Sequence, residues 1–288
     1  MNHDTDGEIE VISQLLENGL LGYQPRKEGK TEQEVGSEYA RSEAQNTQRQ
    51  AGQLQTSPII QTHPDAGRER RKGTPEIIFG EKKETSQIIA MAQGLLTGTG
   101  RAIISRLQPE AVSPIQSAFR ECTVRIREAA RAMVIYSPTY SRVLTGGHIG
   151  VISAGTSDIP VAEEAALVAE EMGCRVTCIY DVGVAGLHRL FRPLRDLLAE
   201  DVDVIIVAAG MDGALPSVIA GLVPVPVIGL PTSIGYGLGG KGVAALLSML
   251  QTCAPGMSVV NIDNGVGAGM TAALIANRIA HAREHQSQ

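Results

Sequence analysis

The amino-acid sequence predicts an α/β protein: a doubly wound parallel sheet in three α/β/α layers, preceded by a small α+β domain. Five apolar, β-branched runs follow Gly147, with stretches of helical spacing between them. Strands that alternate with helices across short loops are typical of a parallel sheet. Aromatic residues make up only 3% of the chain and Trp is absent. The core must therefore be aliphatic, as it is in parallel sheets covered on both faces.

The first 62 residues are predicted to form a helix and a linker. Apolar residues recur at three- and four-residue spacing between Ile9 and Leu20, which predicts an amphipathic helix within residues 1–23. From residue 24 to residue 62, polar residues and glycine replace the periodic apolar ones. A segment of that composition is expected to be a flexible linker.

The small α+β domain is expected between residues 63 and 145. Apolar runs predict strands at 75–79, 102–105 and 132–136, and helical spacing predicts helices at 85–96 and 109–119. Thr85 is expected to cap the first of these helices, since its hydroxyl can accept a hydrogen bond from a free amide.

The parallel sheet is expected between residues 146 and 288, in a catalytic domain. Its strands are predicted at 148–154, 175–180, 202–209, 225–230 and 257–262. Its helices are predicted at 161–172, 188–198, 217–221 and 241–250.

Charge and composition narrow the function. A formal net charge of −6 argues against a nucleic-acid-binding protein, which needs a basic face. Four cysteines are too few and too uneven for a disulfide framework. The acidic start lacks the pattern of a signal peptide, and no apolar run approaches the ~20 residues that span a bilayer. A cytoplasmic protein that binds neither nucleic acid nor membrane is expected.

Polar side chains follow each predicted strand of the large sheet, where such sheets bind ligands. Thr156, Ser157 and Asp158 begin a helix, where they either cap it or bind phosphate at its free amides. His188 and Arg189 either bind a phosphate or carboxylate, or transfer a proton, or form a solvated helical turn. The candidates after the remaining strands are Asp181, Asp212, Ser233, Asn261, Asp263 and Asn264.

Asp212 lies between two glycines at the start of a predicted helix, which suits a general base, an Mg²⁺ ligand or an ordinary turn residue. The loop from Gly235 to Gly242 holds five glycines in eight residues, more than packing is expected to require. Gly235, Tyr236, Gly237 and Lys241 are therefore expected to lie against a ligand. The loop lacks the spacing of a P-loop, which excludes a P-loop NTPase.

Cys253 follows an apolar helix and precedes Ala254-Pro255-Gly256. A buried structural thiol is one interpretation. A nucleophile is the other, and it requires a nearby cation, because a helix carboxyl end does not stabilise a thiolate. That cation is expected from Lys241, a neighbouring subunit or the substrate.

Taken together, these motifs resemble the LarB family, the synthases of pyridinium-3,5-biscarboxylic acid mononucleotide. The resemblance is dense from His148 to Ile279 and reappears in Arg68 to Glu76. The stretches that carry it are Ala154-Gly-Thr-Ser-Asp158, Pro160-Val-Ala-Glu-Glu-Ala, Tyr180-Asp-Val-Gly-Val-Ala-Gly-Leu-His-Arg-Leu190, Gly213-Ala-Leu-Pro-Ser-Val218, Pro231-Thr-Ser-Ile-Gly-Tyr-Gly237, Cys253-Ala and Val260-Asn-Ile-Asp-Asn-Gly265.

The resemblance implies a carboxyl-terminal domain like class I aminoimidazole ribonucleotide carboxylase. It also implies carboxylation of nicotinic acid adenine dinucleotide by CO₂ or bicarbonate, with hydrolysis of its phosphoanhydride to release AMP. Cys253 is then the expected nucleophile, Asp212 the base and His188 a further catalytic group. Mg²⁺ or another divalent cation is expected, with Asp158, Asp181 and Asp263 as candidate ligands, and no organic cofactor.

The sequence departs from the family at Asp212, where the family has Glu. A side chain shorter by one methylene moves the base by ~1.5 Å, enough to affect proton transfer. The stretch from Leu238 to Gly242, and Val266, also differ from the family's forms. These departures bear on substrate positioning and not on the fold.

Two other functions stay open. One is an aminoimidazole ribonucleotide carboxylase or mutase without covalent catalysis, and the other is a non-catalytic nucleotide-binding protein. The sequence argues against an NAD-dependent dehydrogenase, since no Gly-x-Gly-x-x-Gly follows the first strand of the large sheet. A homo-oligomer with shared sites is expected from the kinship of the fold.

Overall fold

The computed structural model describes residues 62–286, which belong to one compact unit, Ile60–Gln288. The helix predicted within residues 1–23 and all but the last residue of the linker predicted at 24–62 lie outside the described residues. Two sheets organise the described part, one of four strands and one of five.

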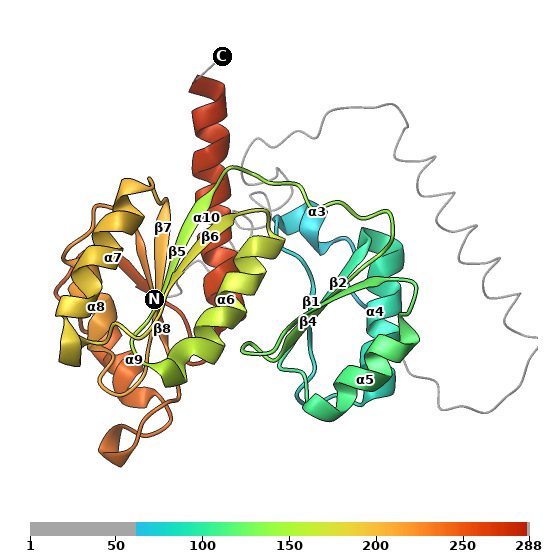
Figure 1. Ribbon diagram of the computed structural model, residues 1–288, viewed down its shortest axis with the longest axis horizontal. Coiled ribbons are helices and arrows are strands. Elements are labelled where there is room, and N and C mark those ends of the chain that lie inside the picture. Colours follow the sequence, from blue (N-terminus) through green and yellow to red (C-terminus); the bar gives the residue numbers. More distant parts are fainter. Residues whose placement is uncertain (1–61, 287–288) are drawn as a thin grey trace, which may run out of the picture. The chain divides into compact units, whose positions relative to one another are not determined.

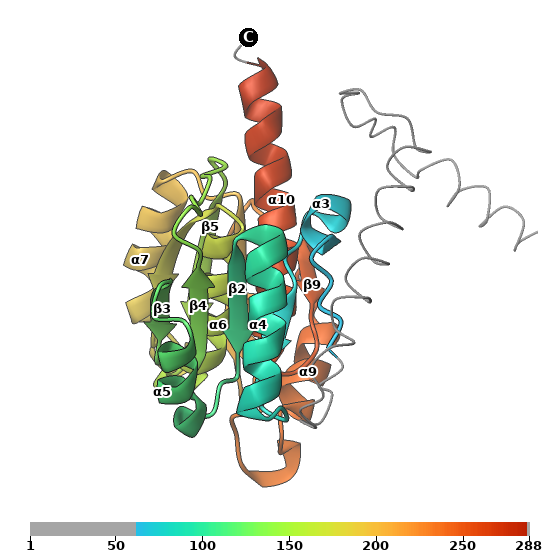
Figure 2. The same cartoon turned by 90° about the vertical axis from the view of Figure 1, so that its right-hand side faces the viewer.

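The smaller sheet has the strand order β1-β2-β4-β3. Its strands are β1 (Ile77–Phe79), β2 (Arg101–Ser105), β3 (Thr123–Arg127) and β4 (Ala132–Tyr136). β1 and β2 are parallel, and the other pairs are antiparallel. The helices α4 (Thr85–Thr99) and α5 (Pro109–Ala118) cover one face, where Ile88, Leu95 and Ile115 are almost wholly buried. Figure 2 shows both helices in front of this sheet.

Three local features of the small domain differ from the sequence prediction. β3 was not predicted, because its alternation of Val124 and Ile126 with arginines is short and only half-buried. The five-residue helix α3 (Arg68–Lys72) was also not predicted, since none of its residues is buried. The predicted cap at Thr85 is wrong: Glu84 is the N-cap of α4, in a reciprocal capping box with Gln87.

The larger sheet is a parallel sheet with the order β6-β5-β7-β8-β9, which confirms the predicted fold class. Its strands are β5 (His148–Ser153), β6 (Arg175–Ile179), β7 (Val204–Ala209), β8 (Val227–Pro231) and β9 (Met257–Val259). The central strands β5, β7 and β8 are fully buried, as their continuous apolar runs indicate. All five strands point the same way, so their carboxyl ends share one edge.

Helices cover both faces of the larger sheet (Figure 1). One face packs against α6 (Ile159–Glu171) and α10 (Gly265–Gln286). The other face packs against α7 (His188–Ala199), α8 (Ala214–Ala220) and α9 (Val243–Leu250). Short 3₁₀ turns lie at η2 (Thr156–Asp158), η3 (Val184–Gly186) and η4 (Gly237–Gly239). None of the helices within residues 62–286 has the length and apolar composition needed to cross a membrane.

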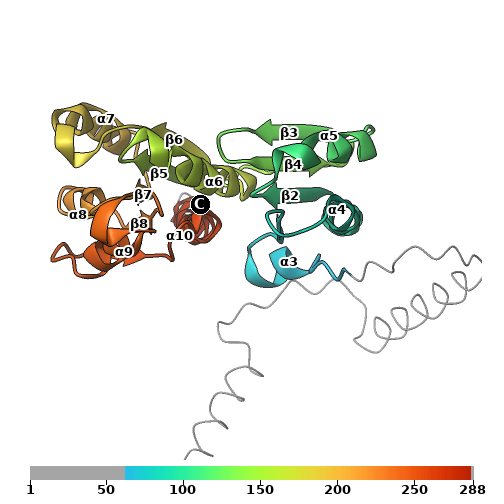
Figure 3. The same ribbon diagram turned by 90° about the horizontal axis from the view of Figure 1, so that it is seen from below.

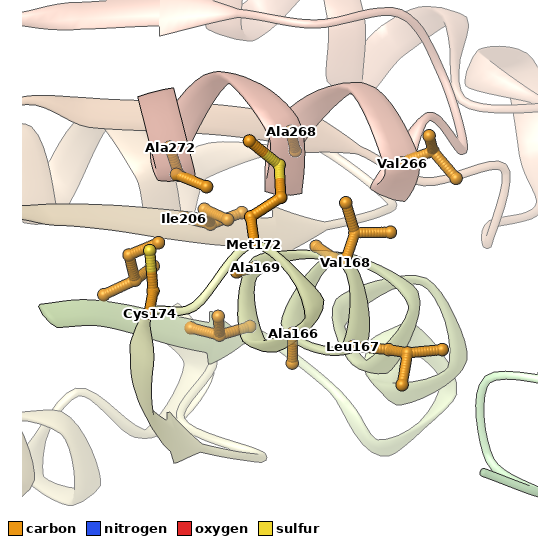
Figure 4. Packing of buried hydrophobic residues seen from close by; sticks show 14 of the residues in the cluster. Ala166, Leu167, Val168, Ala169, Met172, Cys174, Ile206, Val266, Ala268 and Ala272 are labelled. Carbon is orange, nitrogen blue, oxygen red and sulfur yellow. The ribbon is translucent and has the colours of Figure 1, made fainter. Parts of the chain in front are cut away.

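The long helix α10 was not predicted from the sequence. It lies alongside α6 (Figure 3), and its buried face consists almost wholly of small residues. In Figure 4, Ala268 and Ala272 of α10 approach Val168 and Ala169 of α6. Because small residues surround much of this helix, its sequence carries no clear apolar stripe. The helix is therefore recognisable only from its packing.

The side of α6 that faces the smaller sheet carries charged residues that are buried or half-buried. The helix presents the glutamate pairs Glu163-Glu164 and Glu170-Glu171. Their partners in the small domain are Arg101, Ser105, Arg106, Arg125, Arg127 and Tyr136. Apolar residues of β1, β2 and β4 join the same buried cluster as α6. The two sheets thus share α6 as a common layer.

Candidate active site

The carboxyl edge of the larger sheet gathers most of the side chains that the sequence analysis selected. The exposed ones are Thr156, Ser157, His188, Arg189, Asp212, Ser233, Gly235, Tyr236, Gly237, Lys241 and Asn261. Asp181, Asp263 and Asn264 are partly buried, and Asp158 is 4% exposed. Hydrogen bonds between the loops hold them in a defined arrangement.

Asp158 joins the loops after β5 and β8. Its Oδ2 accepts a hydrogen bond from the Gly155 amide at 2.8 Å, and its Oδ1 accepts one from the Thr232 hydroxyl at 2.6 Å. Thr232 is fully buried. Both carboxylate oxygens therefore organise the protein itself, whereas the neighbouring Thr156 and Ser157 remain exposed on the 3₁₀ turn η2.

Asp263 joins the loops after β8 and β9. Its amide donates to the Pro231 carbonyl at 2.9 Å, and its Oδ1 accepts from the Ser233 amide at 2.7 Å. The residue has φ +55°, a left-handed conformation that aspartate adopts more readily than most other non-glycine residues. Asp263 thus fixes the position of the Ser233 backbone.

The loops after β7 and β8 touch at Gly210. A Cβ on this residue would lie 2.2 Å from the Ile234 carbonyl oxygen, so only glycine fits. The Met211 amide donates to the same carbonyl at 2.9 Å. This contact places Asp212 next to the glycine-rich loop. The Asp212 carboxylate is exposed, and its one described bond is a long contact of 3.4 Å from the Ala214 amide.

At the end of β6, two predicted site residues pair with each other. Arg189 donates to the Asp181 carboxylate at 2.7 Å, with both side chains more than 40% exposed. An ion pair this exposed adds little to stability, but it holds the guanidinium beside the strand end. His188 is exposed at the first position of α7.

Burial raises the pKa of the neighbouring Tyr180, which donates a hydrogen bond to Glu163 and stays protonated at neutral pH.

The three aspartates predicted as metal ligands do not converge. Among residues 62–286, no group of three His, Cys, Asp or Glu side chains is placed to hold a metal ion. Asp158, Asp181 and Asp263 are each bonded to other parts of the protein. Their role as metal ligands stays a prediction. Mg²⁺ that enters with substrate phosphates needs only one or two carboxylates, so the divalent cation stays a prediction.

The glycine-rich loop is only partly what the sequence analysis expected. Packing accounts for Gly239 and Gly242: a Cβ would lie 2.3 Å from the Ala244 Cβ at the first and 2.7 Å from the Thr232 carbonyl at the second. The statement that packing does not require these glycines is therefore wrong for two of the five. Around Gly237 nothing lies within 4 Å of such a Cβ. That end of the loop has room for a ligand.

Cys253 is exposed, but it lies at the opposite edge of the sheet from Asp212. Helix α9 begins beside the Thr232 carbonyl, at the carboxyl end of β8, and runs back along the sheet. After it, the Gly256 carbonyl accepts a hydrogen bond from the amide of Val227, the first residue of β8. The five residues of β8 span about 16 Å. Cys253 and Asp212 of one chain therefore do not share a site.

Comparison with known proteins agrees with this architecture. Residues 148–288 match the model of the AIR carboxylase family. The chain belongs to this family. Residues 58–137 match the LarB/PurE-like N-terminal domain. The AIR carboxylase family is a carboxylase and mutase family, so the chain has the fold and the domain of such enzymes.

Three proteins show how similar this chain is to its relatives. An uncharacterized protein of Methanocaldococcus jannaschii, MJ0165, is 44% identical over 75% of this chain and 84% of its own length. N5-carboxyaminoimidazole ribonucleotide mutase of Thermotoga maritima is 31% identical over 44% of this chain and 73% of its own. The mutase of Pyrococcus abyssi is 36% identical over 46% of this chain and 72% of its own.

One group beside this edge was not predicted from the sequence. Arg106 and Glu164 line a cavity of about 190 Å³ together with Asp263. The rule that selected the other candidates, a polar residue directly after a strand, also applies to Arg106, which follows β2. It was overlooked because the rule was applied only to the larger sheet.

Proposed function

We propose that this protein carboxylates the pyridinium ring of nicotinic acid adenine dinucleotide and hydrolyses the phosphoanhydride. The products are pyridinium-3,5-biscarboxylic acid mononucleotide, the intermediate of nickel-pincer cofactor synthesis, and AMP. The observation that carries the proposal is the combination in one chain of the LarB/PurE-like N-terminal domain and the AIR carboxylase domain. The exposed Cys253, which suits covalent catalysis, supports it.

The chemistry assigns a distinct role to each group. A pyridinium ring is too electron-poor to attack CO₂. When the Cys253 thiolate adds to the ring, the product is a dihydropyridine whose neighbouring carbon is an enamine nucleophile. That carbon bonds to CO₂, a base removes its proton, and the C–S bond breaks to restore the aromatic ring. One CO₂ is consumed and one proton released, with no oxidant or reductant.

Asp212 suits the role of base because its carboxylate is exposed at the carboxyl edge. His188 and Arg189 suit a phosphate or carboxylate of the substrate, and so do the exposed hydroxyls of Thr156 and Ser157. The open end of the glycine loop at Gly237, next to the 83% exposed Tyr236, offers a surface for ribose or a base. Lys241, Ser233, Asn261 and Asn264 complete the proposed substrate-binding set.

Because Cys253 and Asp212 lie at opposite edges, we propose that a site combines Asp212 of one copy with Cys253 of a second copy. The surface around Cys253 favours association. Val243, Leu247 and Leu250 are each at least 50% exposed on α9, at spacings that place them on one face. An exposed apolar stripe of this kind is typical of an interface. A homo-oligomer with shared sites follows from this arrangement.

The first experiment incubates purified protein with nicotinic acid adenine dinucleotide, bicarbonate and Mg²⁺, and detects AMP and the dicarboxylated mononucleotide by mass spectrometry. We expect both products with the native protein, and neither with Cys253→Ala or Asp212→Asn. If these two variants are mixed and co-refolded, about a quarter of the sites should combine an intact Asp212 with an intact Cys253. No recovery of activity would contradict the shared site.

A second candidate function is N5-carboxyaminoimidazole ribonucleotide mutase. The similarity to named mutases over the AIR carboxylase domain favours it. The same protein preparation distinguishes the two. Conversion of N5-carboxyaminoimidazole ribonucleotide, with no product from the dinucleotide, would replace the proposed function by this one.

A further inference from the structure

Arg106 connects the small domain to the carboxyl edge of the larger sheet. It directly follows β2 and has φ +53°. Its side chain is 35% exposed and lines the cavity of about 190 Å³ between Glu81 and Arg131 on one side and Pro160, Glu164 and Asp263 on the other. The guanidinium therefore projects from the small domain toward the loop that follows β9.

The contacts of Arg106 fix the orientation of its planar group. Nη2 donates a hydrogen bond to the main-chain carbonyl of Asp263, and Nε donates to Glu164 Oε1 at 3.4 Å. Glu164 is 4% exposed, and the same oxygen accepts a hydrogen bond from the Ser105 hydroxyl. Two consecutive residues of the small domain thus share one buried carboxylate on α6. A rigid fork with several donors suits this task better than a single ammonium.

The residue that Arg106 binds is itself a junction of the candidate site. The Asp263 amide donates to Pro231, the last residue of β8, and its carboxylate accepts from Ser233, two residues farther along the chain. The Arg106 bond to the Asp263 carbonyl is a third attachment, and it comes from the other domain. These three attachments act on one short turn, so the loss of the Arg106 bond should loosen that turn.

We infer that Arg106 is a positioning residue: it holds the Asp263 turn, and through it the Ser233 backbone, in the geometry that the candidate active site uses. The small domain is then part of the site and not merely an appendage. The expected loss of kcat rests on the proposed function. The expected loosening of the Asp263 turn does not, because it concerns the folded structure alone.

The test compares Arg106→Gln with Arg131→Gln in the full-length protein. Arg131 lines the same cavity, but its side chain bonds to the Leu107 carbonyl within the small domain. Both variants lose one positive charge. Amide hydrogen exchange is followed in peptides covering residues 229–235 and 260–265. We expect Arg106→Gln to speed exchange at Ser233 and Asp263 about tenfold, and Arg131→Gln to leave both unchanged.

Arg106→Lys supplies the conservative variant, and it should restore part of the protection with a single donor. In the proposed reaction, kcat of Arg106→Gln should fall about tenfold or more while KM changes less than threefold. The side chains that bind the substrate are all present in this variant, but the Ser233 backbone is no longer held in position. Equal exchange in Arg106→Gln and Arg131→Gln would overturn the inference. Faster exchange in a protein without activity toward the dinucleotide would leave the inference standing and remove the proposed function.

Discussion

The Thr232 hydroxyl donates a hydrogen bond to Asp158 Oδ1 at 2.6 Å, which ties together two strand ends that lie 74 positions apart in the chain. Neither side chain is more than 4% exposed. Since a buried carboxylate needs its donors, this pair sets the spacing between the loops after β5 and β8. The exposed hydroxyls of Thr156 and Ser157 lie directly beside it in the chain.

Replacing Thr232 by Val keeps the shape and removes this donor. We expect the free energy of unfolding to fall by about 1–3 kcal/mol, because Asp158 Oδ1 is left buried without its partner. Urea denaturation measures the change. Thr232→Ser keeps the hydroxyl and should lose less than Thr232→Val. An unchanged free energy of unfolding in Thr232→Val, or a smaller loss there than in Thr232→Ser, would show that the hydrogen bond does not set the stability of this pair.

Gly210 provides a second test of loop spacing. In Gly210→Ala, the new Cβ would lie 2.2 Å from the Ile234 carbonyl oxygen and 2.8 Å from Thr232 Oγ1, so the loops after β7 and β8 must separate. We expect a loss of about 1–3 kcal/mol, as for other overpacked sites. Gly221→Ala is the matched control, since its nearest neighbour would be 3.6 Å away. Unfolding free energies that fall equally in both would contradict the close approach.

The strand ends were predictable because period and composition mark each strand. The apolar runs of β5 and β7 read directly as buried parallel strands, and their direction places Thr156 and Asp212 at one edge. α10 was not predictable in this way, since its core contacts are alanines that pack against α6. No local pattern distinguishes such a helix from a loop rich in small residues.

The sequence predicted where in the fold the candidate site lies, but not which residues contact one another there. Strand-helix alternation already implies that α9 returns to the amino edge, which separates Cys253 from Asp212. The prediction of one site for both residues rested on the neighbours of each residue in the chain and took no account of this return. The Arg106 contact with Asp263 spans 157 positions and joins two domains. Contacts of that kind depend on tertiary structure alone.

The ion pair between Arg101 and Glu171 gives a prediction about the layer shared by the two sheets. The side chains are 3% and 0% exposed, and the Tyr136 hydroxyl also donates to Glu171 at 2.6 Å. Arg101→Met should lower the free energy of unfolding by about 3–5 kcal/mol, because Glu171 keeps its charge in a buried position.

The double variant Arg101→Met/Glu171→Gln should be less destabilised than the sum of the two single variants. Removing both charges leaves no unpaired ion in a buried position, since Glu69, the other partner of Arg101, is 42% exposed, so the coupling between the sites should exceed about 1 kcal/mol. A double-mutant cycle by urea denaturation measures it. Strict additivity would mean that the two side chains do not depend on each other.

Cys174 makes stability depend on alkaline pH. Its side chain is 2% exposed and lies 3.1 Å from Asn277 Oδ1, and burial raises the pKa of its thiol to about 11 from a reference value of 9.0. Between pH 9 and pH 11 the unfolded chain loses this proton while the folded chain keeps it. The free energy of unfolding therefore falls as pH rises through this window, by about 2–3 kcal/mol in total.

Cys174→Ala and Cys174→Val remove the titrating group while leaving cavities of different size. Below about pH 8, each variant should differ from the native protein in its free energy of unfolding by an offset that does not change with pH. That offset differs between the two variants, because their cavities differ in size. Between pH 9 and pH 11 both offsets should shift by the same 2–3 kcal/mol or so in favour of the variants, since only the native protein carries the buried thiol. Urea denaturation at each pH, with a reductant present, measures the offsets. If they stay constant up to pH 11, the Cys174 thiol ionises as readily in the folded chain as in the unfolded one, and burial does not govern it.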